Sequence, residues 1–72
     1  MLFGGDIVMS YRIVHIYKNG VEKYITSHPV ENNKWRSSHK EDARIFQTVR
    51  AAKRFIDEKY EYPIDYRIEE AI

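Results

Sequence analysis

One segment of the chain, residues 48–60, has a start, a buried face and an end that can all be predicted from its residues. Thr48 is a favourable N-cap, because its hydroxyl can accept a hydrogen bond from a free backbone N–H group of the first helical turn. Apolar side chains then recur with a period of about 3.6 residues, and Pro63 ends the helical region. A helix of this length is marginal in water, so it must lay its apolar stripe on another element. The stripe consists of Val49, Ala52, Phe55, Ile56 and Tyr60.

The charges of this predicted helix run against its dipole. Arg50, Lys53 and Arg54 come early, whereas Asp57 and Glu58 come late. The helix dipole favours the opposite order, with acids in the first turn and bases in the last. Cations around a helix N-terminus predict an anion-binding site. The alternative is a solvated face with scattered charges, and this is the more common situation.

Three further segments predict strands. Residues 11–18 carry apolar side chains on both faces at their centre, which is typical of an interior strand, and residues 21–26 return as a second strand. Asn19-Gly20 between them favours a two-residue type I′ turn. After the helix, residues 64–69 alternate between apolar and charged side chains and predict a last strand with one buried face.

The segment between the predicted second strand and residue 40 has no clear helical or strand periodicity. Residues 27–39 are polar and rich in turn-forming residues, which predicts a loop. Trp35 stands alone in it, and we favour a ring that anchors the loop on the core over an exposed binding residue.

Residues 40–47 fit two interpretations. Ser38 and Glu41 form a capping box that would start a helix early and continue it to Tyr60. We favour instead a short extended segment at residues 44–46 that leads to a new N-cap at Thr48. The chain is therefore predicted to be a small α+β domain of order β-β-(β)-α-β, with one helix packed on an antiparallel sheet.

Length and composition restrict the domain further. The 72 residues allow one small domain with a marginal core, and a homodimer would be one way to complete its burial. The absence of cysteine excludes disulfides and fits a reducing cytoplasm. No apolar run is long enough for a membrane span, so we expect a cytoplasmic protein without membrane contact.

The net charge of +1 hides an asymmetry. Residues 34–54 carry seven basic and two acidic side chains, a net charge of +5, and residues 55–72 carry two basic and six acidic ones, a net charge of −4. A basic segment next to an acidic end indicates a charged partner, although the two segments could also pair with each other.

Residues 1–8 are interpreted as an extension that need not be native, and residues 9–72 as the single domain. Gly4-Gly5-Asp6 can be encoded by GGA-GGT-GAT, a bacterial ribosome-binding sequence, a short distance before Met9. Our hypothesis is that natural translation begins at Met9, and the glycine codons test it.

Catalytic motifs are missing from the sequence. It contains no cysteine nucleophile, no glycine-rich phosphate loop and no H-E-x-x-H helix. The histidines at positions 15, 28 and 39 are too widely spaced to predict a common metal site. We therefore expect no enzyme, no cofactor and no metal, with His15 as a half-buried sheet residue.

Trp35, the run Ala43-Arg44-Ile45-Phe46 and the pattern F-x-T-x-x-x-A-x-x-F-I at residues 46–56 resemble a pattern common in small phage and prophage proteins of unknown function. The resemblance covers about a third of the chain, and its residues are of the fold-forming kind. It implies an origin in a phage or another mobile element, and it implies no catalytic residue.

Binding is then the expected function. We favour a protein partner over nucleic acid, because a net charge of +1 is low for a protein that binds phosphates. Nucleic acid bound through the basic segment 34–54, which also contains Lys40, is the alternative, with Trp35 stacking on a base. The candidate partner- or nucleic-acid-binding residues are Lys34, Trp35, Arg36, Arg44, Arg50, Lys53 and Arg54.

Overall fold

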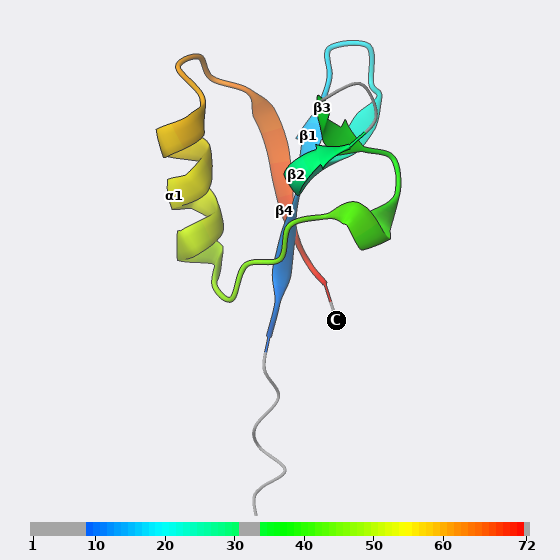
Figure 1. Cartoon of the computed structure of the whole chain (residues 1–72). Coiled ribbons are helices and arrows are strands. Elements are labelled where there is room, and N and C mark those ends of the chain that lie inside the picture. The colour runs from blue at the N-terminus through cyan, green and yellow to red at the C-terminus, as the bar shows by residue number, and fades with distance from the viewer. Residues whose placement is uncertain (1–8, 31–33, 72) are drawn as a thin grey trace, which may run out of the picture.

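A computed structural model describes residues 9–30 and 34–71 (Figure 1). The four strands form one antiparallel sheet of order β3-β2-β1-β4, and the helix packs on one face of it. This confirms the predicted α+β class. Residues 1–8, on which the hypothesis of a start at Met9 depends, lie outside the described part of the chain. The elements are β1 (Tyr11–Ile16), β2 (Glu22–Val30), β3 (Lys34–Ser37), the 3-10 helix η2 (Lys40–Asp42), α1 (Val49–Lys59) and β4 (Asp65–Glu70).

Strand β1 is an interior strand, as predicted. It pairs with β2 on one edge and with β4 on the other. Its neighbouring residues Ile13 and Val14 are 0% and 2% exposed. Because successive side chains point to opposite faces of a sheet, both faces are covered at the centre of this strand.

The turn between β1 and β2 differs from the predicted type I′ turn. Gly20 N donates to Tyr17 O at 2.9 Å, and Tyr17 N donates to Val21 O at 2.8 Å, so the loop contains three residues rather than two. Gly20 has a φ of 89°, which suits the left-handed residue that ends such a loop. The longer loop sets the register that pairs Val14 with Tyr24 and Ile16 with Glu22.

The prediction of a loop over residues 27–39 is wrong. Strand β2 continues to Val30, and β3 follows within the same segment. Pro29 fits into β2 because the register between β2 and β3 shifts between Ile25 and Val30, and proline is tolerated where the ladder is irregular. The turn-forming residues therefore mark an irregularity within a strand pair.

Residues 43–46 form the extended segment that we favoured. Ala43 bridges to Thr26 of β2, and Phe46 bridges to Tyr11 of β1. The 3-10 helix η2 precedes this segment, and its N-cap residue His39 makes no side-chain cap hydrogen bond. The alternative of one long helix from Ser38 is thus excluded, and the third strand is β3 rather than residues 44–46.

Helix α1 begins at the predicted N-cap. Thr48 Oγ1 accepts a hydrogen bond from Ala51 N at 3.0 Å. Ala52 and Ile56 are the buried residues of the helix. Val49, which we expected in the apolar stripe, is 38% exposed, because it lies one turn before the point where the helix meets the sheet.

The core lies between α1 and one face of the sheet. Ile13 and Ile25 come from the sheet, Ala52 and Ile56 from the helix, and Phe46 from the segment between them. The predicted buried face of the last strand packs against this cluster. The partly buried apolar residues that pack against the core cluster are Tyr11, Phe55, Tyr60, Ile64, Tyr66 and Ile68.

The opposite face of the sheet carries an ion-pair network. Arg12 is only 8% exposed and holds Glu69, with its Nε atom 2.7 Å from Glu69 Oε2. Arg67 Nη2 lies 2.8 Å from Glu22 Oε1 and 3.3 Å from Glu69 Oε1. The hydrogen bond that Arg67 Nη2 donates to Glu22 Oε1, together with the positive charge of Arg67, lowers the pKa of Glu22.

Candidate partner-binding surface

The structure divides the seven predicted binding residues among three places. Lys34, Trp35 and Arg36 lie on the edge strand β3, and Arg44 lies in the extended segment before α1. Arg50, Lys53 and Arg54 lie on exposed positions of the helix. These seven residues alone therefore do not form one continuous surface.

Rings and cations join two of these places into one surface. Arg44 lies over the Phe55 ring, with 4.7 Å from Cζ to the ring centroid, and over the Phe46 ring at 5.2 Å. Lys59 Nζ lies 6.0 Å from the Phe55 centroid and 5.9 Å from the Trp35 centroid. We call the residues Arg44, Phe55, Lys59 and Trp35 the basic–aromatic strip.

The core supports the strip from below. Phe46 is buried, and its ring centroid lies 5.3 Å from that of Phe55 at an interplanar angle of 58°. Ile25 and Tyr60 line the same shallow depression as Trp35, Phe55 and Lys59. The aromatic part of the strip is therefore packed on the core.

Trp35 does not anchor a loop in the core as we expected. It lies on β3, is 45% exposed, and is absent from the buried cluster. It lines a shallow depression together with Phe55 and Tyr60. The expectation of a buried anchor is therefore wrong, and nearly half of the surface of Trp35 is exposed to solvent.

Arg36 is occupied by contacts within the chain. Its Nε atom donates to His15 Nδ1 at 3.0 Å, its Nη2 atom donates to the Tyr60 hydroxyl, and its Cζ lies 5.1 Å from the Tyr60 ring centroid. The His15 ring also stacks on Tyr17 at 4.3 Å. Arg36 therefore ties β3 to β1 and to the end of α1.

The environment of His15 favours its neutral form. Burial, followed by the positive charge of Arg36, lowers the pKa of His15, and the charge of Asp65 acts in the opposite direction. His15 Nδ1 accepts the Arg36 hydrogen bond, so the proton of the neutral ring belongs on Nε2. Protonation of Nδ1 would break this bond.

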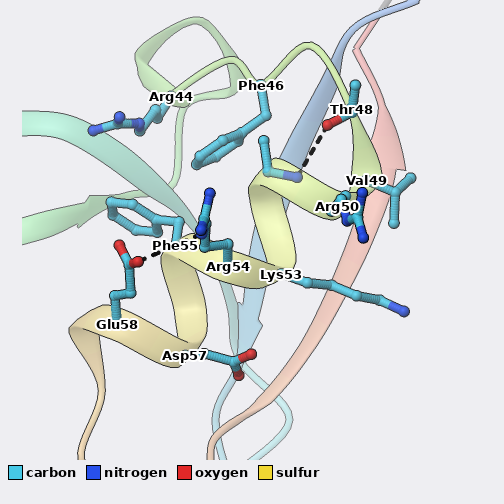
Figure 2. A pocket seen from close by; sticks show the side chains of 11 residues that line it. Arg44, Phe46, Thr48, Val49, Arg50, Lys53, Arg54, Phe55, Asp57 and Glu58 are labelled. Carbon is cyan, nitrogen blue, oxygen red and sulfur yellow. Dashed lines mark hydrogen bonds and ion pairs between the residues drawn. The ribbon is translucent and has the colours of Figure 1, made fainter.

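The cations of α1 spread around its exposed surface. In Figure 2, Lys53 and Val49 point to one side of the helix, whereas Arg44 and Phe55 lie on the other side. Arg54 forms an exposed i,i+4 ion pair with Glu58, with 3.6 Å between Nε and Oε2. Lys53 thus points away from the basic–aromatic strip, and Arg54 is paired with Glu58, so neither belongs to it.

The charge asymmetry of the sequence is largely retained in the fold. Among the described residues, Arg54–Glu58 is the one ion pair that joins the basic segment 34–54 to the acidic end. The other acid of that end that forms an ion pair among the described residues is Glu69, and it contacts Arg12 and Arg67 instead. The basic segment therefore keeps most of its charge on the outside.

Residues 9–30 and 34–71 contain no group of three or more His, Asp or Glu side chains that could hold a metal ion. Within the same residues, no helix has the length and apolar character needed to cross a membrane.

Two members of the strip, Phe55 and Lys59, are not among the binding residues predicted from the sequence. Phe55 was assigned to the apolar stripe of the helix, and Lys59 was counted only as a charge of the acidic end. Both follow the helical spacing, since positions i and i+4 lie on the same side of a helix. Their meeting with Trp35 depends on where α1 packs on the sheet.

No protein-family model matches this chain, and no curated protein or solved structure is significantly similar to it.

Proposed function

We propose that this chain is a small, non-enzymatic interaction protein that binds an acidic segment of a partner protein through the basic–aromatic strip. It would act as an accessory protein of a phage or another mobile element, in the cytoplasm of a bacterial or phage-infected cell. The observation that carries the proposal is that the cations of Arg44 and Lys59 both lie over the Phe55 ring, next to the half-exposed Trp35.

This arrangement suits a carboxylate together with an apolar side chain. Arg44 offers a planar guanidinium that can bind a carboxylate through two hydrogen bonds. Lys59 offers three donors on a flexible side chain, and its cation–π contacts near 6 Å are at the outer limit of that interaction, so it is easily redirected to a partner. Tryptophan and arginine are also the residues that dominate binding energy at protein interfaces.

Two observations favour protein over nucleic acid. The ring of Phe55 is half-buried and already has the cations of Arg44 and Lys59 over it, so it offers little open surface on which a base could stack. Asp57 and Glu58 stand among Arg50, Lys53 and Arg54, and they reduce the local positive charge that phosphates need.

Nucleic acid is the second candidate, on the strength of Trp35. This ring is 45% exposed, stands beside Lys34 on β3, and has Lys59 near it, which is a basic–aromatic arrangement used to bind single strands. Amide NMR titration with short single- and double-stranded DNA tests this reading. Nucleic-acid binding should weaken by about 0.7–0.9 log units per log unit of salt for each phosphate contacted.

Affinity retention on the immobilised chain tests the main proposal. We expect a bacterial-lysate protein to remain bound after nuclease treatment and to elute with free acidic peptide. Trp35→Ala should weaken retention by roughly 30-fold, the equivalent of a hot-spot loss of about 2 kcal/mol.

The triple variant Arg50→Ala, Lys53→Ala, Arg54→Ala is the matched control, because these three residues lie beside the strip. It should retain the partner. If nuclease removes everything that the chain retains, or if the triple variant loses binding while Trp35→Ala keeps it, the protein-partner proposal is wrong.

A further inference from the structure

The outer edge of β4 has no neighbour among the described residues. The sheet order β3-β2-β1-β4 places β4 at the end of the sheet, with its inner edge paired to β1 over six residues and no irregularity. Such an edge presents a row of backbone N–H and C=O groups that readily pair with another strand. Residues 65–70 contain no proline and no lysine, and their pairing with β1 has no bulge, so three of the usual means of protecting an edge are absent. The strand is charged at Asp65, Arg67, Glu69 and Glu70, and these charges disfavour a partner strand that does not complement them.

We propose that the outer edge of β4 binds the β4 of a second copy of this chain, antiparallel, with the two-fold axis at Ile68. The resulting dimer has one continuous eight-stranded sheet. The inference is independent of the basic–aromatic strip, which lies on other elements.

Charge complementarity selects this register. With the axis at Ile68, Arg67 lies opposite the partner's Glu69, and Glu69 lies opposite the partner's Arg67. An axis at Arg67 would place Arg67 opposite the partner's Arg67, and an axis at Glu69 would place Glu69 opposite the partner's Glu69. Like charges directly opposite each other are destabilising. An axis at Tyr66 would pair only residues 65–67 of the strand, whereas the axis at Ile68 pairs residues 66–70.

The backbone is oriented for this pairing. Ala71 N donates to Ser10 O at 2.8 Å, which fixes the inward-facing positions at this end of the strand. Because inward and outward groups alternate along a strand, the N–H and C=O groups of Ile68 point away from β1. Two copies of Ile68 can therefore exchange a pair of backbone hydrogen bonds across the axis.

The side chains on the core-facing side gain burial. Ile68 and Tyr66 are only partly buried within one chain, although they pack against the core. Pairing at the axis places Ile68 beside the partner's Ile68, which covers apolar surface that a small single domain leaves exposed. On the other side, Arg67 is half-exposed and can bind the partner's Glu69 in addition to its contacts within the chain.

Single-cysteine variants of this cysteine-free chain test the register directly. Opposite residues in a hydrogen-bonded antiparallel pair have Cα atoms about 5.5 Å apart, which lies within the disulfide range of about 4.4–6.8 Å. We expect Ile68→Cys to form a covalent dimer on mild oxidation. Tyr66→Cys alone should not, because its copy is displaced by four residues, or about 13 Å.

Two further arms complete the test. A mixture of Tyr66→Cys with Glu70→Cys, one of them carrying a size tag, should give the mixed covalent dimer. Sedimentation of the cysteine-free chain should show a dimer whose affinity falls at least tenfold in Arg67→Glu, with Lys18→Glu in the exposed turn as the charge-matched control.

The proposal fails if the unaltered chain remains a monomer at all concentrations. It also fails if Tyr66→Cys crosslinks to itself as well as Ile68→Cys does, or if Arg67→Glu leaves dimerisation unchanged while amide spectra show that the variant is folded. Capture of a different protein by this edge in place of a second copy would likewise overturn it.

Discussion

At the scale of single residues, Arg36 shows how one guanidinium can hold three elements together. It contacts His15 on β1 and Tyr60 at the end of α1 while its own backbone lies in β3. The basic segment predicted Arg36 as an exposed binding residue, but its guanidinium donates hydrogen bonds to His15 and Tyr60 within the chain. Nothing in the sequence separated it from Arg44, because the difference depends on which face of β3 lies toward His15.

His15 should titrate below the ordinary histidine range. Burial and then the charge of Arg36 lower its pKa, so the folded chain takes up the proton less readily than the unfolded chain. The free energy of unfolding should therefore be at its full value above about pH 6.5 and fall as the pH decreases through the lowered pKa.

NMR of the imidazole signals during a pH titration measures this shift. Arg36→Gln should raise the pKa of His15, because it removes the neighbouring positive charge. Arg50→Gln on the outer surface of α1 serves as the charge-matched control and should leave it unchanged. A His15 pKa at or above the ordinary value in the unaltered chain would contradict the described geometry.

Thr48 is the residue that the sequence predicted best. Thr48→Ala removes the hydroxyl that accepts the Ala51 N–H group, and it should lower the free energy of unfolding by about 1 kcal/mol. Thermal unfolding should then occur about 4–8 °C lower in a domain of this size. Thr48→Ser keeps the hydroxyl and should stay close to the unaltered chain; equal losses in both variants would exclude the cap as the cause.

At the scale of elements, α1 combines a buried contact with an exposed charged surface. Ala52 and Ile56 face the core, and the cations on the outer surface contact little. The period of 3.6 residues located this helix and its start in the sequence. It did not show that Val49 lies outside the contact, because the crossing point of helix and sheet depends on tertiary packing.

The triple variant Arg50→Ala, Lys53→Ala, Arg54→Ala should change the free energy of unfolding by no more than about 0.5 kcal/mol. Its exposed Arg54–Glu58 pair contributes little, and removal of cations near the helix N-terminus relieves an unfavourable interaction with the dipole. Urea unfolding measures the effect. A loss of several kcal/mol would mean that these side chains have structural contacts that the described surface lacks.

Strands β2 and β3 show where prediction from the local sequence fails. The turn-forming residues of the segment 27–39 predicted a loop, yet the chain forms two paired strands there with a shifted register. Local composition favoured a turn, and pairing across the sheet prevailed over it. Residues far apart in the sequence, such as Arg12 and Glu69, meet for the same reason, and no local spacing predicts such a pair.

At the scale of the whole molecule, the core depends on the segment between η2 and α1. β1 and β2 pair only next to their turn, over residues 14–16 and 22–24. Beyond that point Ala43 contacts Thr26 and Phe46 contacts Tyr11, so the extended segment joins the two strands where they no longer pair. Phe46 thereby reaches the centre of the core and also supports Phe55 of the strip.

Phe46→Ala should therefore be among the most damaging single changes. Truncation of a buried phenylalanine costs about 3–5 kcal/mol, which is a large part of the 5–15 kcal/mol of stability roughly expected for a domain. Urea unfolding of the variant measures the loss. Ile45→Ala at the exposed neighbouring position is the control and should be nearly neutral; similar losses in both would contradict the described core.

The central claim, that the basic–aromatic strip binds a partner protein, is tested most directly by site-specific photo-crosslinking inside the cell. Benzoylphenylalanine in place of Trp35 should trap a protein, and the adduct should persist after nuclease treatment. The same group in place of Tyr62, a highly exposed aromatic residue in the loop after α1, should trap far less. Equal trapping at both positions, or an adduct at position 35 that nuclease degrades, would contradict the proposed function.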